Sequence, residues 1–563
     1  MNPSTAVATV LVDELVRGGV REAVLAPGSR SAPVAIALHA ADAASSLRLH
    51  VRVDERSAAF LALGLARASG RPVAVLTTSG TAASNAHPAV LEASYGGVPL
   101  VVLTADRPPE LRETGANQAV DQVGLYGSAV RFSHDVGVPE ERPGQVAYWR
   151  ALVGRALVAA RGALGGGPGP VHLNLPLREP LLPDGPGSPG WPEPLDGRAE
   201  GEPWVSVGDT VTPGGVEVDD ADRPTVVVAG AGDEGVGARL GADLGWPVLA
   251  EPVSGSFVPP VAVPAAPLVL GVGDWVADHR PGRVVVTGRP TLSRTVLRVL
   301  AAESIEVWAV AGARYPDPGR SVARVVPGLM LSGGARAPDA WLAAWVSAGE
   351  AALRAVGEVL DAHGGPTGPG VARSVLAGLP DGASLVVGAS QPVRDLHLAA
   401  RPRTGVSPYG NRGVSGIDGT VSTAVGVALA RPGPTYALMG DLTFLHDANG
   451  LVVGPGEPRP DLTVVVVNDD GGGIFTLLEQ GAPEHAGAFE RVFGTPHGVD
   501  LAALCLATGT GHVRVADLAG LVAELGRPEG VRVVEVRVDR SAHRDLHARL
   551  RSATAAALGA DPA

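Results

Sequence analysis

The chain has 563 residues, of which 45% are hydrophobic and 18% charged, a composition typical of a globular protein with well-formed cores. Its formal net charge of −13 argues against nucleic acid or an anionic membrane surface as the main partner. No lysine occurs, so all 45 Lys and Arg positions are arginine, which excludes a Schiff-base lysine and a P-loop lysine. Cationic contacts to a substrate must therefore come from arginine forks, which suit carboxylates and phosphates.

Cys505 is the single cysteine and lies in an apolar segment. This excludes disulfides within the chain, iron–sulfur clusters and thiolate zinc sites, and it predicts a buried structural thiol. The N-terminal segment has acidic residues and helical spacing, without the basic region and apolar core of a signal peptide. No apolar stretch approaches the roughly 20 residues that cross a bilayer. We therefore expect a cytoplasmic protein.

Residues 1–185 alternate helices and strands. A helix over 5–17 precedes a strand that runs into the Pro-Gly-Ser-Arg turn at 27–30. A second strand ends near Asp54-Glu55, and a strand–turn–helix–strand unit covers 72–108. This alternation predicts a parallel, doubly wound α/β sheet. Such sheets bind ligands beyond the carboxyl ends of their strands, which is where these polar turns lie.

The next stretch, 186–203, is rich in proline and glycine without periodicity and predicts a linker. A second α/β unit follows over 204–344. In it the glycine-rich turn 230–235 comes directly after an apolar strand, and Glu251 lies near the position of a ribose-binding acid. This partial match to a dinucleotide fingerprint supports, as an alternative function, a flavin- or nicotinamide-binding oxidoreductase.

Residues 345–563 form a third α/β unit centred on the stretch 439–475. One apolar strand runs into Gly440-Asp441, and the strand 462–467 runs into Asn468-Asp469-Asp470 and three glycines. Oxygen ligands at two strand ends can hold a hard divalent cation, and the glycine amides can close on a diphosphate. Two polar β-turns would give the same local sequence, so these residues alone leave both interpretations open.

Glu55 lies where a strand gives way to a helix with apolar residues behind it. Its carboxylate could hydrogen-bond a ligand and have its pKa tuned by burial, although a first-turn glutamate favoured by the helix dipole would look the same. Four arginines follow strands or lie in glycine-rich turns: Arg30, Arg107, Arg394 and Arg412. Because arginines in such places often bind carboxylates in bidentate fashion, they suggest an acidic substrate.

Together these features resemble the thiamine-diphosphate enzymes, and most closely the family of carboligases that serves menaquinone biosynthesis. The matching segments are 26–33, 54–60, 77–90, 104–118, 411–419, 440–447 and 468–475. The middle of the chain matches only weakly. The resemblance implies three doubly wound parallel-sheet domains. They are a pyrimidine-binding domain (1–185), a central dinucleotide-like domain (204–344) and a diphosphate- and metal-binding domain (345–563).

The resemblance also implies an activity, the decarboxylation of 2-oxoglutarate and conjugate addition of the resulting carbanion to isochorismate. Thiamine diphosphate would be the electron sink, held through Mg²⁺ or Mn²⁺. Glu55 would be the catalytic residue, hydrogen-bonded to N1′ of the cofactor's aminopyrimidine. Ile417 would hold the cofactor in its bent conformation. The family further implies a homodimer or homotetramer with active sites at the interface.

Three sets of site residues follow from the resemblance. The cofactor site would comprise Glu55, Thr78, Ile417, Gly440, Asp441, Leu442, Asp469, Gly471, Ile474 and Phe475. The substrate site would comprise Ser29, Arg30, Arg107, Asn117, Gln118, Ser390, Arg394 and Arg412. The metal ligands would be Asp441, Asp469 and Gly471.

The chain departs from the family pattern at the metal segment. Many relatives carry asparagine where Asp469 stands, and Asp441 and Asp469 are one residue further apart than is usual. Asn468 is therefore the alternative ligand. From the central domain, Arg289 is the candidate for a cationic contact to substrate.

Three rival classes make different predictions. Another thiamine enzyme, such as an acetolactate synthase or a simple 2-oxoacid decarboxylase, would share the metal segment but not the arginine set. An oxidoreductase would bind flavin or nicotinamide at 230–235. A non-catalytic scaffold would have only polar turns at 439–475.

Overall fold

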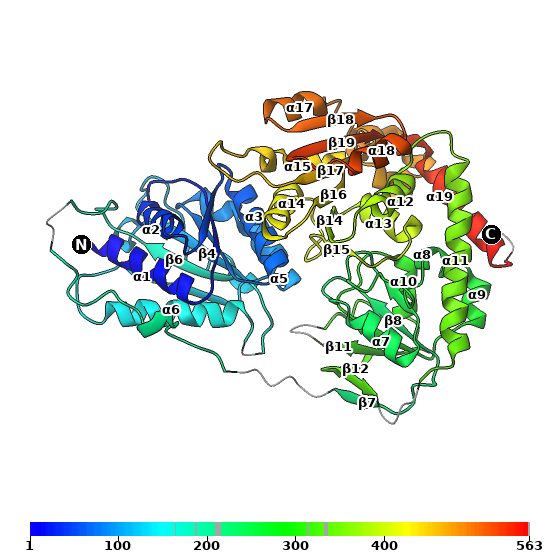
Figure 1. Cartoon of the computed structure of the whole chain (residues 1–563), viewed down its shortest axis with the longest axis horizontal. Helices are drawn as coiled ribbons and strands as arrows, with labels where there is room; N and C mark the ends of the chain where they lie inside the picture. Colours follow the sequence, from blue (N-terminus) through cyan, green and yellow to red (C-terminus); the bar gives the residue numbers. More distant parts are fainter. Residues whose placement is uncertain (164, 186–188, 209–214, 312–314, 332–335, 561–563) are drawn as a thin grey trace. The chain divides into compact units, whose positions relative to one another are not determined.

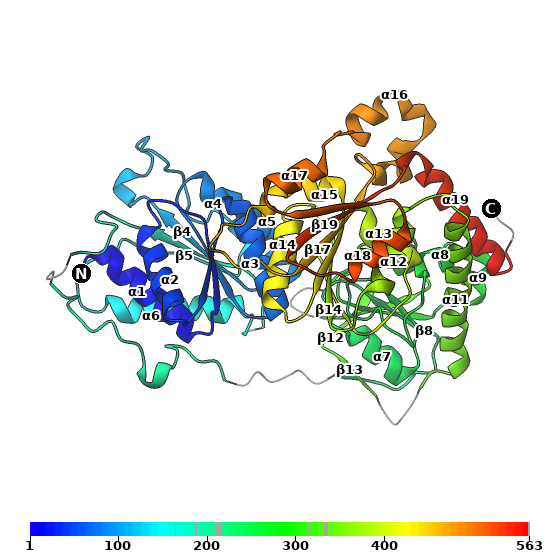
Figure 2. The same cartoon turned by 45° about the horizontal axis from the view of Figure 1, so that its top comes forward.

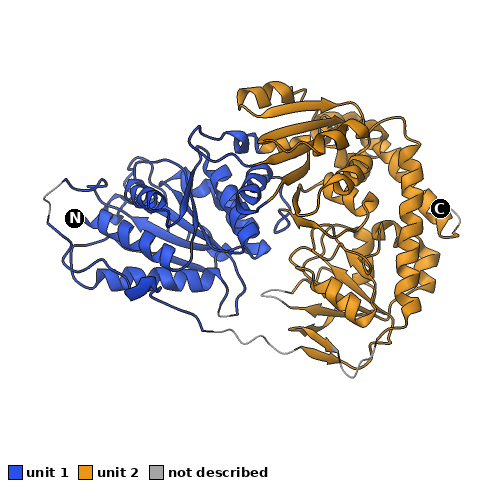
Figure 3. Ribbon diagram, in the orientation of Figure 1, with its two compact units in different colours: residues 1–211, 411–432, 447–460 blue, residues 212–410, 433–446, 461–563 orange. Residues whose placement is uncertain are grey.

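The computed structural model describes residues 1–163, 165–185, 189–208, 215–311, 315–331 and 336–560. Part of the predicted linker, residues 186–188, lies outside the described residues. The chain divides into two compact units, distinguished by colour in Figure 3. Unit 1 consists of residues 1–211, 411–432 and 447–460, and unit 2 of residues 212–410, 433–446 and 461–563.

Unit 1 is built on a six-stranded sheet with the order β2-β1-β3-β4-β6-β5, in which neighbouring strands are parallel. Its strands are β1 (Glu22–Leu25), β2 (Arg48–Val51), β3 (Val73–Thr77), β4 (Leu100–Asp106), β5 (Phe132–Asp135) and β6 (Val171–Pro176). Its N-terminal helices are α1 (Pro3–Arg17), α2 (Ala32–Ala43), α3 (Glu55–Ser69), α4 (Thr81–Asn85), α5 (His87–Gly96) and α6 (Gln145–Ala160). Strands β3 and β4 are buried along their whole length, because α1 and α6 cover one face of the sheet and α3 and α5 the other (Figure 1).

The later segments of unit 1 pack on α3 through glycines. Helix α14 (Thr420–Ala430) lies against α3. A Cβ atom added at Gly64 would lie 2.2 Å from the carbonyl oxygen of Thr423, and one at Gly426 would lie 2.4 Å from that of Leu61. Only glycine allows the two backbones to approach this closely. The packing fixes the helix whose first residue is Glu55.

Unit 2 contains two larger parallel sheets and a two-stranded one. The five-stranded sheet has the order β12-β11-β10-β8-β9, and the six-stranded sheet the order β15-β14-β16-β17-β19-β18. The strands of the first part are β7 (Val216–Val218), β8 (Thr225–Ala229), β9 (Val248–Ala250), β10 (Arg283–Thr287), β11 (Glu306–Val310), β12 (Val322–Val326) and β13 (Leu329–Leu331). Those of the second are β14 (Ala383–Val387), β15 (Val406–Tyr409), β16 (Thr435–Gly440), β17 (Leu462–Asn468), β18 (Gly511–Val515) and β19 (Val531–Arg537).

Helices flank the five-stranded and the six-stranded sheets of unit 2. They are α7 (Val236–Leu244), α8 (Ala266–Val269), α9 (Gly273–Asp278), α10 (Arg294–Leu300), α11 (Asp339–Asp361), α12 (Gly368–Gly378), α13 (Gln391–Ala399), α15 (Asp441–His446), α16 (Ala486–Phe489), α17 (Leu501–Ala507), α18 (Leu518–Leu525) and α19 (His543–Ala557). The long helix α11 runs beside α19 in both views (Figures 1 and 2). None of the described helices is both long enough and apolar enough to span a bilayer.

The predicted α/β class with several parallel-sheet domains is therefore confirmed, whereas the boundaries at 185, 204 and 344 stay a prediction. One local expectation needs correction, because β2 ends at Val51 and does not run on to Asp54. The Asp54 side chain instead caps α3 by accepting hydrogen bonds from the amides of Arg56 (2.8 Å) and Ser57 (3.2 Å). Cys505 is buried as expected, and burial raises its pKa to about 11.

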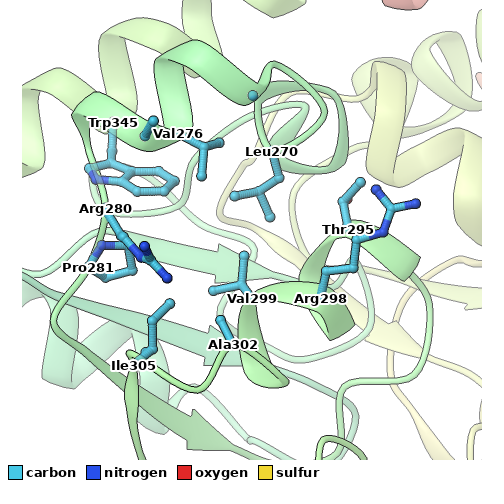
Figure 4. A pocket seen from close by; sticks show the side chains of 12 residues that line it. Leu270, Val276, Arg280, Pro281, Thr295, Arg298, Val299, Ala302, Ile305 and Trp345 are labelled. Atoms are coloured by element: carbon cyan, nitrogen blue, oxygen red, sulfur yellow. The ribbon is translucent and has the colours of Figure 1, made fainter.

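Unit 2 also contains a cavity of about 320 Å³ beside the five-stranded sheet (Figure 4). Its walls are mainly apolar, and Trp345 forms one of them, packed edge-on against Trp275 at 4.9 Å between ring centroids. Arg280 and Arg298 also line it. The residues that line this cavity include none of the predicted site residues.

Candidate active site

The metal segment predicted from the sequence lies at the carboxyl ends of two adjacent strands. Strands β16 and β17 pair in parallel, with Gly440 opposite Val467, so the residues that follow both strands emerge at the same edge. The backbone amide of Gly471 donates a hydrogen bond of 2.9 Å to Oδ2 of Asp441. The two turns are therefore in direct contact.

This edge of the sheet holds two carboxylates in an environment that disfavours their charge. Asp441 is buried, and burial raises its pKa, opposed by hydrogen bonds from Gly471, His497 and Leu442. Burial, together with the charge of Asp441, raises the pKa of Asp469 to about 7. A divalent cation between the two carboxylates would relieve both effects.

The glycines around these carboxylates leave room for a ligand. A Cβ atom at Gly440 would meet no atom within 4 Å, so there is open space beside Asp441. At Gly473, by contrast, a Cβ atom would lie 1.8 Å from Oδ2 of Asp469, so this carboxylate can take its position only next to glycine. Within the described ranges no cluster of three or more His, Cys, Asp or Glu suits a metal, so a cation here would complete its shell with backbone, water or phosphate oxygens. The residues present fit a hard cation bound to a diphosphate.

Asn468, the alternative ligand, has its side chain engaged elsewhere. Its Nδ2 donates to Oε1 of Glu535 at 2.7 Å, and its Oδ1 accepts from the amide of Asp470 at 3.1 Å. Both polar atoms of the Asn468 side chain are therefore hydrogen-bonded within the protein. Beyond the turn, Ile474 and Phe475 lie in the short helix Gly473–Leu477 and are partly buried, with the Phe475 ring 5.8 Å from that of Phe493. Leu442 follows Asp441 in α15 and donates its amide to Oδ1 of Asp441 at 2.6 Å.

Ser390 and Arg394 lie at the start of α13. Ser390 has a φ of 73°, and its carbonyl oxygen accepts a hydrogen bond of 2.6 Å from Nη1 of Arg394. The pKa of Arg394 is lowered mainly by burial, while the charges of Glu251 and Asp395 raise it and that of Arg294 lowers it. The central sheet therefore brings both an acid and a second guanidinium close to Arg394.

The sequence pointed to Arg289 as the cationic group of the central sheet, whereas the structure brings Arg294 near Arg394. The backbone of Arg289 forms two hydrogen bonds with Ala231, at 2.9 and 3.1 Å, in an isolated antiparallel bridge. Arg294 is the first residue of α10, directly after the capping Ser293. A serine after an apolar strand is a typical helix start, and this signal could have placed Arg294 at the beginning of a helix.

The structure does not favour the dinucleotide site suggested by residues 230–235. The carboxylate of Asp233 already occupies the N-terminal end of α7, accepting hydrogen bonds from the amides of Gly235 (3.0 Å) and Gly237 (2.8 Å) and from the Ser256 hydroxyl. Oε1 of Glu251, the predicted ribose ligand, accepts from the amides of Thr291 and Leu292. The fingerprint fails because the protein's own side chains fill the positions of a pyrophosphate and a ribose.

In unit 1, Glu55 is the first residue of α3 and is partly exposed. Its nearest hydrogen-bond partner, Nδ2 of Asn85, lies 3.4 Å from Oε2, which leaves the carboxylate only weakly engaged. Ile417 and Arg412 belong to the same unit, on the glycine-rich stretch before α14. That stretch is fixed by the buried Glu92, whose carboxylate accepts from the amides of Gly413 (2.6 Å) and Val414 (2.7 Å).

Two predicted substrate arginines of unit 1 lie close to each other. Arg30 is 9% exposed, and its pKa is lowered first by burial and then by the charge of Arg107. Nη1 of Arg107 donates to the hydroxyl of Ser79 at 2.8 Å, and that hydroxyl donates to the carbonyl oxygen of Gln118 at 2.9 Å. Two neighbouring guanidiniums, one of them buried, form a natural site for an anionic ligand.

The remaining predicted residues of unit 1 lie on the turns that follow β1, β3 and β4. Gln118 has a φ of 56° and, like Asn117, is exposed on the loop after β4. Ser29 is exposed in the turn after β1, and the buried Thr78 packs against that turn, since a Cβ atom at Gly28 would lie 2.3 Å from Thr78 Cβ. Sequence reasoning missed Ser79, which holds Arg107 and Gln118 together.

The chain was compared with known protein families, sequences and structures. Residues 5–125 match the N-terminal TPP binding domain of thiamine pyrophosphate enzymes, and residues 387–536 match the C-terminal TPP binding domain. A benzoylformate decarboxylase from Polynucleobacter necessarius is similar in structure, with a TM-score of 0.65 at 19% identity, covering 95% of this chain and 98% of that one. This likeness shows a shared fold.

Full-length relatives are much closer in sequence. A protein from Saccharopolyspora erythraea is 53% identical over 99% of this chain and 100% of its own length. One from Nocardia farcinica is 52% identical over 98% of this chain and 99% of its own length. Both bear the same name. At this identity and coverage the chain belongs to the family of 2-succinyl-5-enolpyruvyl-6-hydroxy-3-cyclohexene-1-carboxylate synthases, which are thiamine-diphosphate-dependent enzymes.

Proposed function

We propose that the chain decarboxylates 2-oxoglutarate and transfers the remaining four-carbon unit to isochorismate in menaquinone biosynthesis. The observation that carries this proposal is the pair Arg30 and Arg107: Arg30 is buried, Arg107 is held by Ser79, and the pKa of Arg30 is lowered by burial and then by the charge of Arg107. Such a pair suits a substrate with more than one carboxylate, and 2-oxoglutarate and isochorismate are both of this kind. Ser29, Asn117, Gln118, Ser390, Arg394 and Arg412 complete the proposed substrate site.

Asp441, Asp469 and the backbone of Gly471 would hold a divalent cation, Mg²⁺ or Mn²⁺, that anchors the diphosphate of the cofactor. The open space at Gly440 and the engagement of Asn468 elsewhere support this ligand set. Thr78, Ile417, Leu442, Ile474 and Phe475 would also border the cofactor. When bound, thiamine diphosphate supplies the electron sink for decarboxylation.

Glu55 would share a proton with N1′ of the cofactor's aminopyrimidine. Its weak engagement with Asn85 supports this role, because the carboxylate has capacity for a stronger partner. We further propose a cytoplasmic homodimer or homotetramer, with active sites formed between subunits. From the central sheet, Arg289 stays a predicted cationic contact, and we propose Arg294 as a second candidate because its charge acts on Arg394.

A direct test mixes the protein with thiamine diphosphate, Mg²⁺ and 2-oxoglutarate, with and without isochorismate, and follows the loss of 2-oxoglutarate. Loss that depends on isochorismate is expected, whereas turnover of pyruvate alone would point to another thiamine enzyme. Glu55→Gln should abolish nearly all activity with an unchanged melting temperature. Asp339→Asn, at the first-turn acid of α11, is the matched control and should retain activity. Absence of isochorismate-dependent turnover in the wild-type protein would refute the proposed function.

A further inference from the structure

A segment later in the sequence packs against the turn that carries the proposed metal ligand Asp469. We call residues 490–500 the His497 loop. The carbonyl oxygen of Gly494 accepts a hydrogen bond of 2.7 Å from the amide of Gly472. A Cβ atom at Gly471, where φ is +141°, would lie 1.9 Å from that same oxygen. The glycines after Asp470 thus allow the loop to pack directly against the turn that carries Asp469.

Asp470 fastens the His497 loop to this turn. Its backbone has a φ of 56°, and its Oδ1 accepts hydrogen bonds from the amides of His497 (3.2 Å) and Gly498 (2.9 Å). These bonds lower the pKa of Asp470, with the Gly498 amide as the largest cause. The third residue of Asn-Asp-Asp, which has no place in the proposed ligand set, therefore has a structural partner.

The hydrogen bonds of His497 assign its neutral tautomer. The amide of Val499 donates to Nδ1 at 3.0 Å, so Nδ1 carries no proton. The ring proton is then on Nε2, which lies 3.1 Å from Oδ2 of Asp441 and donates to it. The side chain of His497 is 12% exposed, so little water competes for this bond.

With His497 in place, the orientation of the Asp441 carboxylate is fixed by three donors. Oδ2 accepts from His497 and from the amide of Gly471, and Oδ1 accepts from the amide of Leu442. Two of these donors come from the backbone and one from a side chain. The side-chain donor is the one that a substitution can remove.

We propose that His497, held in place by Asp470, is a positioning residue that orients Asp441 to bind a divalent cation. This inference rests on the metal site of the proposed function. It follows the general behaviour of metal sites, in which a group that hydrogen-bonds a ligating carboxylate sets its orientation. Removal of such a group lowers metal affinity about 10- to 100-fold.

The test measures Mn²⁺ affinity in the presence of thiamine diphosphate, with free Mn²⁺ followed by electron paramagnetic resonance. His497→Ala is expected to weaken Mn²⁺ binding about 10- to 100-fold. His497→Gln should retain most of the affinity, because its amide N–H can take the place of Nε2–H. His485→Ala, at an exposed histidine in the same part of the sequence, is the control and should leave the affinity unchanged.

Asp470→Ala provides a second perturbation that leaves the imidazole intact. It should weaken Mn²⁺ binding in the same direction, and the double variant with His497→Ala should be no weaker than the more affected single variant. Wild-type protein without Mn²⁺ binding would refute the metal site itself. Wild-type affinity in a folded His497→Ala variant, or additive losses in the double variant, would overturn the proposed role of His497 while leaving the proposed function standing.

Discussion

Replacement of Asp395 by asparagine should stabilise the protein at neutral pH. Asp395 lies in α13 and is 2% exposed. Its Oδ1 accepts a hydrogen bond of 2.6 Å from Gln391, and its Oδ2 packs against Gly368, where a Cβ atom would lie 2.4 Å away. Burial, with a smaller contribution from the charge of Asp469, raises the pKa of Asp395 to about 8.

The sign of the effect follows from the two protonation states. An unfolded aspartate has a pKa of about 3.9, so the unfolded chain loses this proton near pH 4, whereas the folded chain keeps it to about pH 8. Stability therefore falls as the pH rises between these values and levels off above the higher one. At about 1.4 kcal/mol per unit, the roughly three units up to pH 7 amount to about 4 kcal/mol. Asparagine does not ionise and removes this loss.

Urea unfolding of the wild-type protein and of Asp395→Asn at pH 4.5, 6 and 7.5 would measure the difference. The two should be nearly equal at the lowest pH, and the variant should become steadily more stable as the pH rises. Asp361→Asn, at an exposed acid of α11, should show no such trend. A stability difference that does not change with pH would refute the reasoning, because it would mean that Asp395 does not hold a proton in the folded state.

Two further substitutions test the substrate site and the packing of unit 1. Arg107→Gln should raise the KM for 2-oxoglutarate or isochorismate about 10- to 100-fold, because hydrogen bonds to charged groups contribute ~1.5–3 kcal/mol. An unchanged KM in steady-state kinetics would contradict this prediction. Gly64→Ala should lower the melting temperature, because its Cβ atom would lie 2.2 Å from a backbone carbonyl of α14, at a cost of about 1–3 kcal/mol. Gly357→Ala, where the nearest atom is the tip of an arginine side chain at 3.4 Å, is the control and should not lower it.

The sequence was sufficient to locate the strands and the polar turns that end them. The run 462–467 was expected to be a strand, and β17 covers Leu462–Asn468. Such predictions succeed because a buried parallel strand is a short apolar run closed by Gly, Asn or Asp, and these signals are local. Since the carboxyl ends of neighbouring strands share one edge, the contact between the Asp441 and Asp469 turns also followed from the order of the elements.

Residues that act from other elements could not be found in this way. Ser79 and His497 have no distinctive local sequence, and their partners are 39 and 56 residues away. The dinucleotide prediction for the turn 230–235 failed for the complementary reason. Its glycines match a fingerprint locally, whereas Ala231 and Asp233 within the turn bond to Arg289 and Ser256 further along the chain. Only the tertiary structure decides whether a turn that matches the motif binds a ligand or is occupied by side chains of the same chain.

Burial bears on the two interpretations of the metal segment that the sequence left open. Acids in plain β-turns stay in water, where their charge costs little. Here Asp441 is 1% exposed, and burial together with the charge of Asp441 raises the pKa of Asp469 to about 7. The charge of Arg540 and backbone hydrogen bonds oppose this rise. Two carboxylates that repel each other in a desolvated site are relieved by a proton or by a bound cation, so this arrangement favours a site for a ligand over a simple turn.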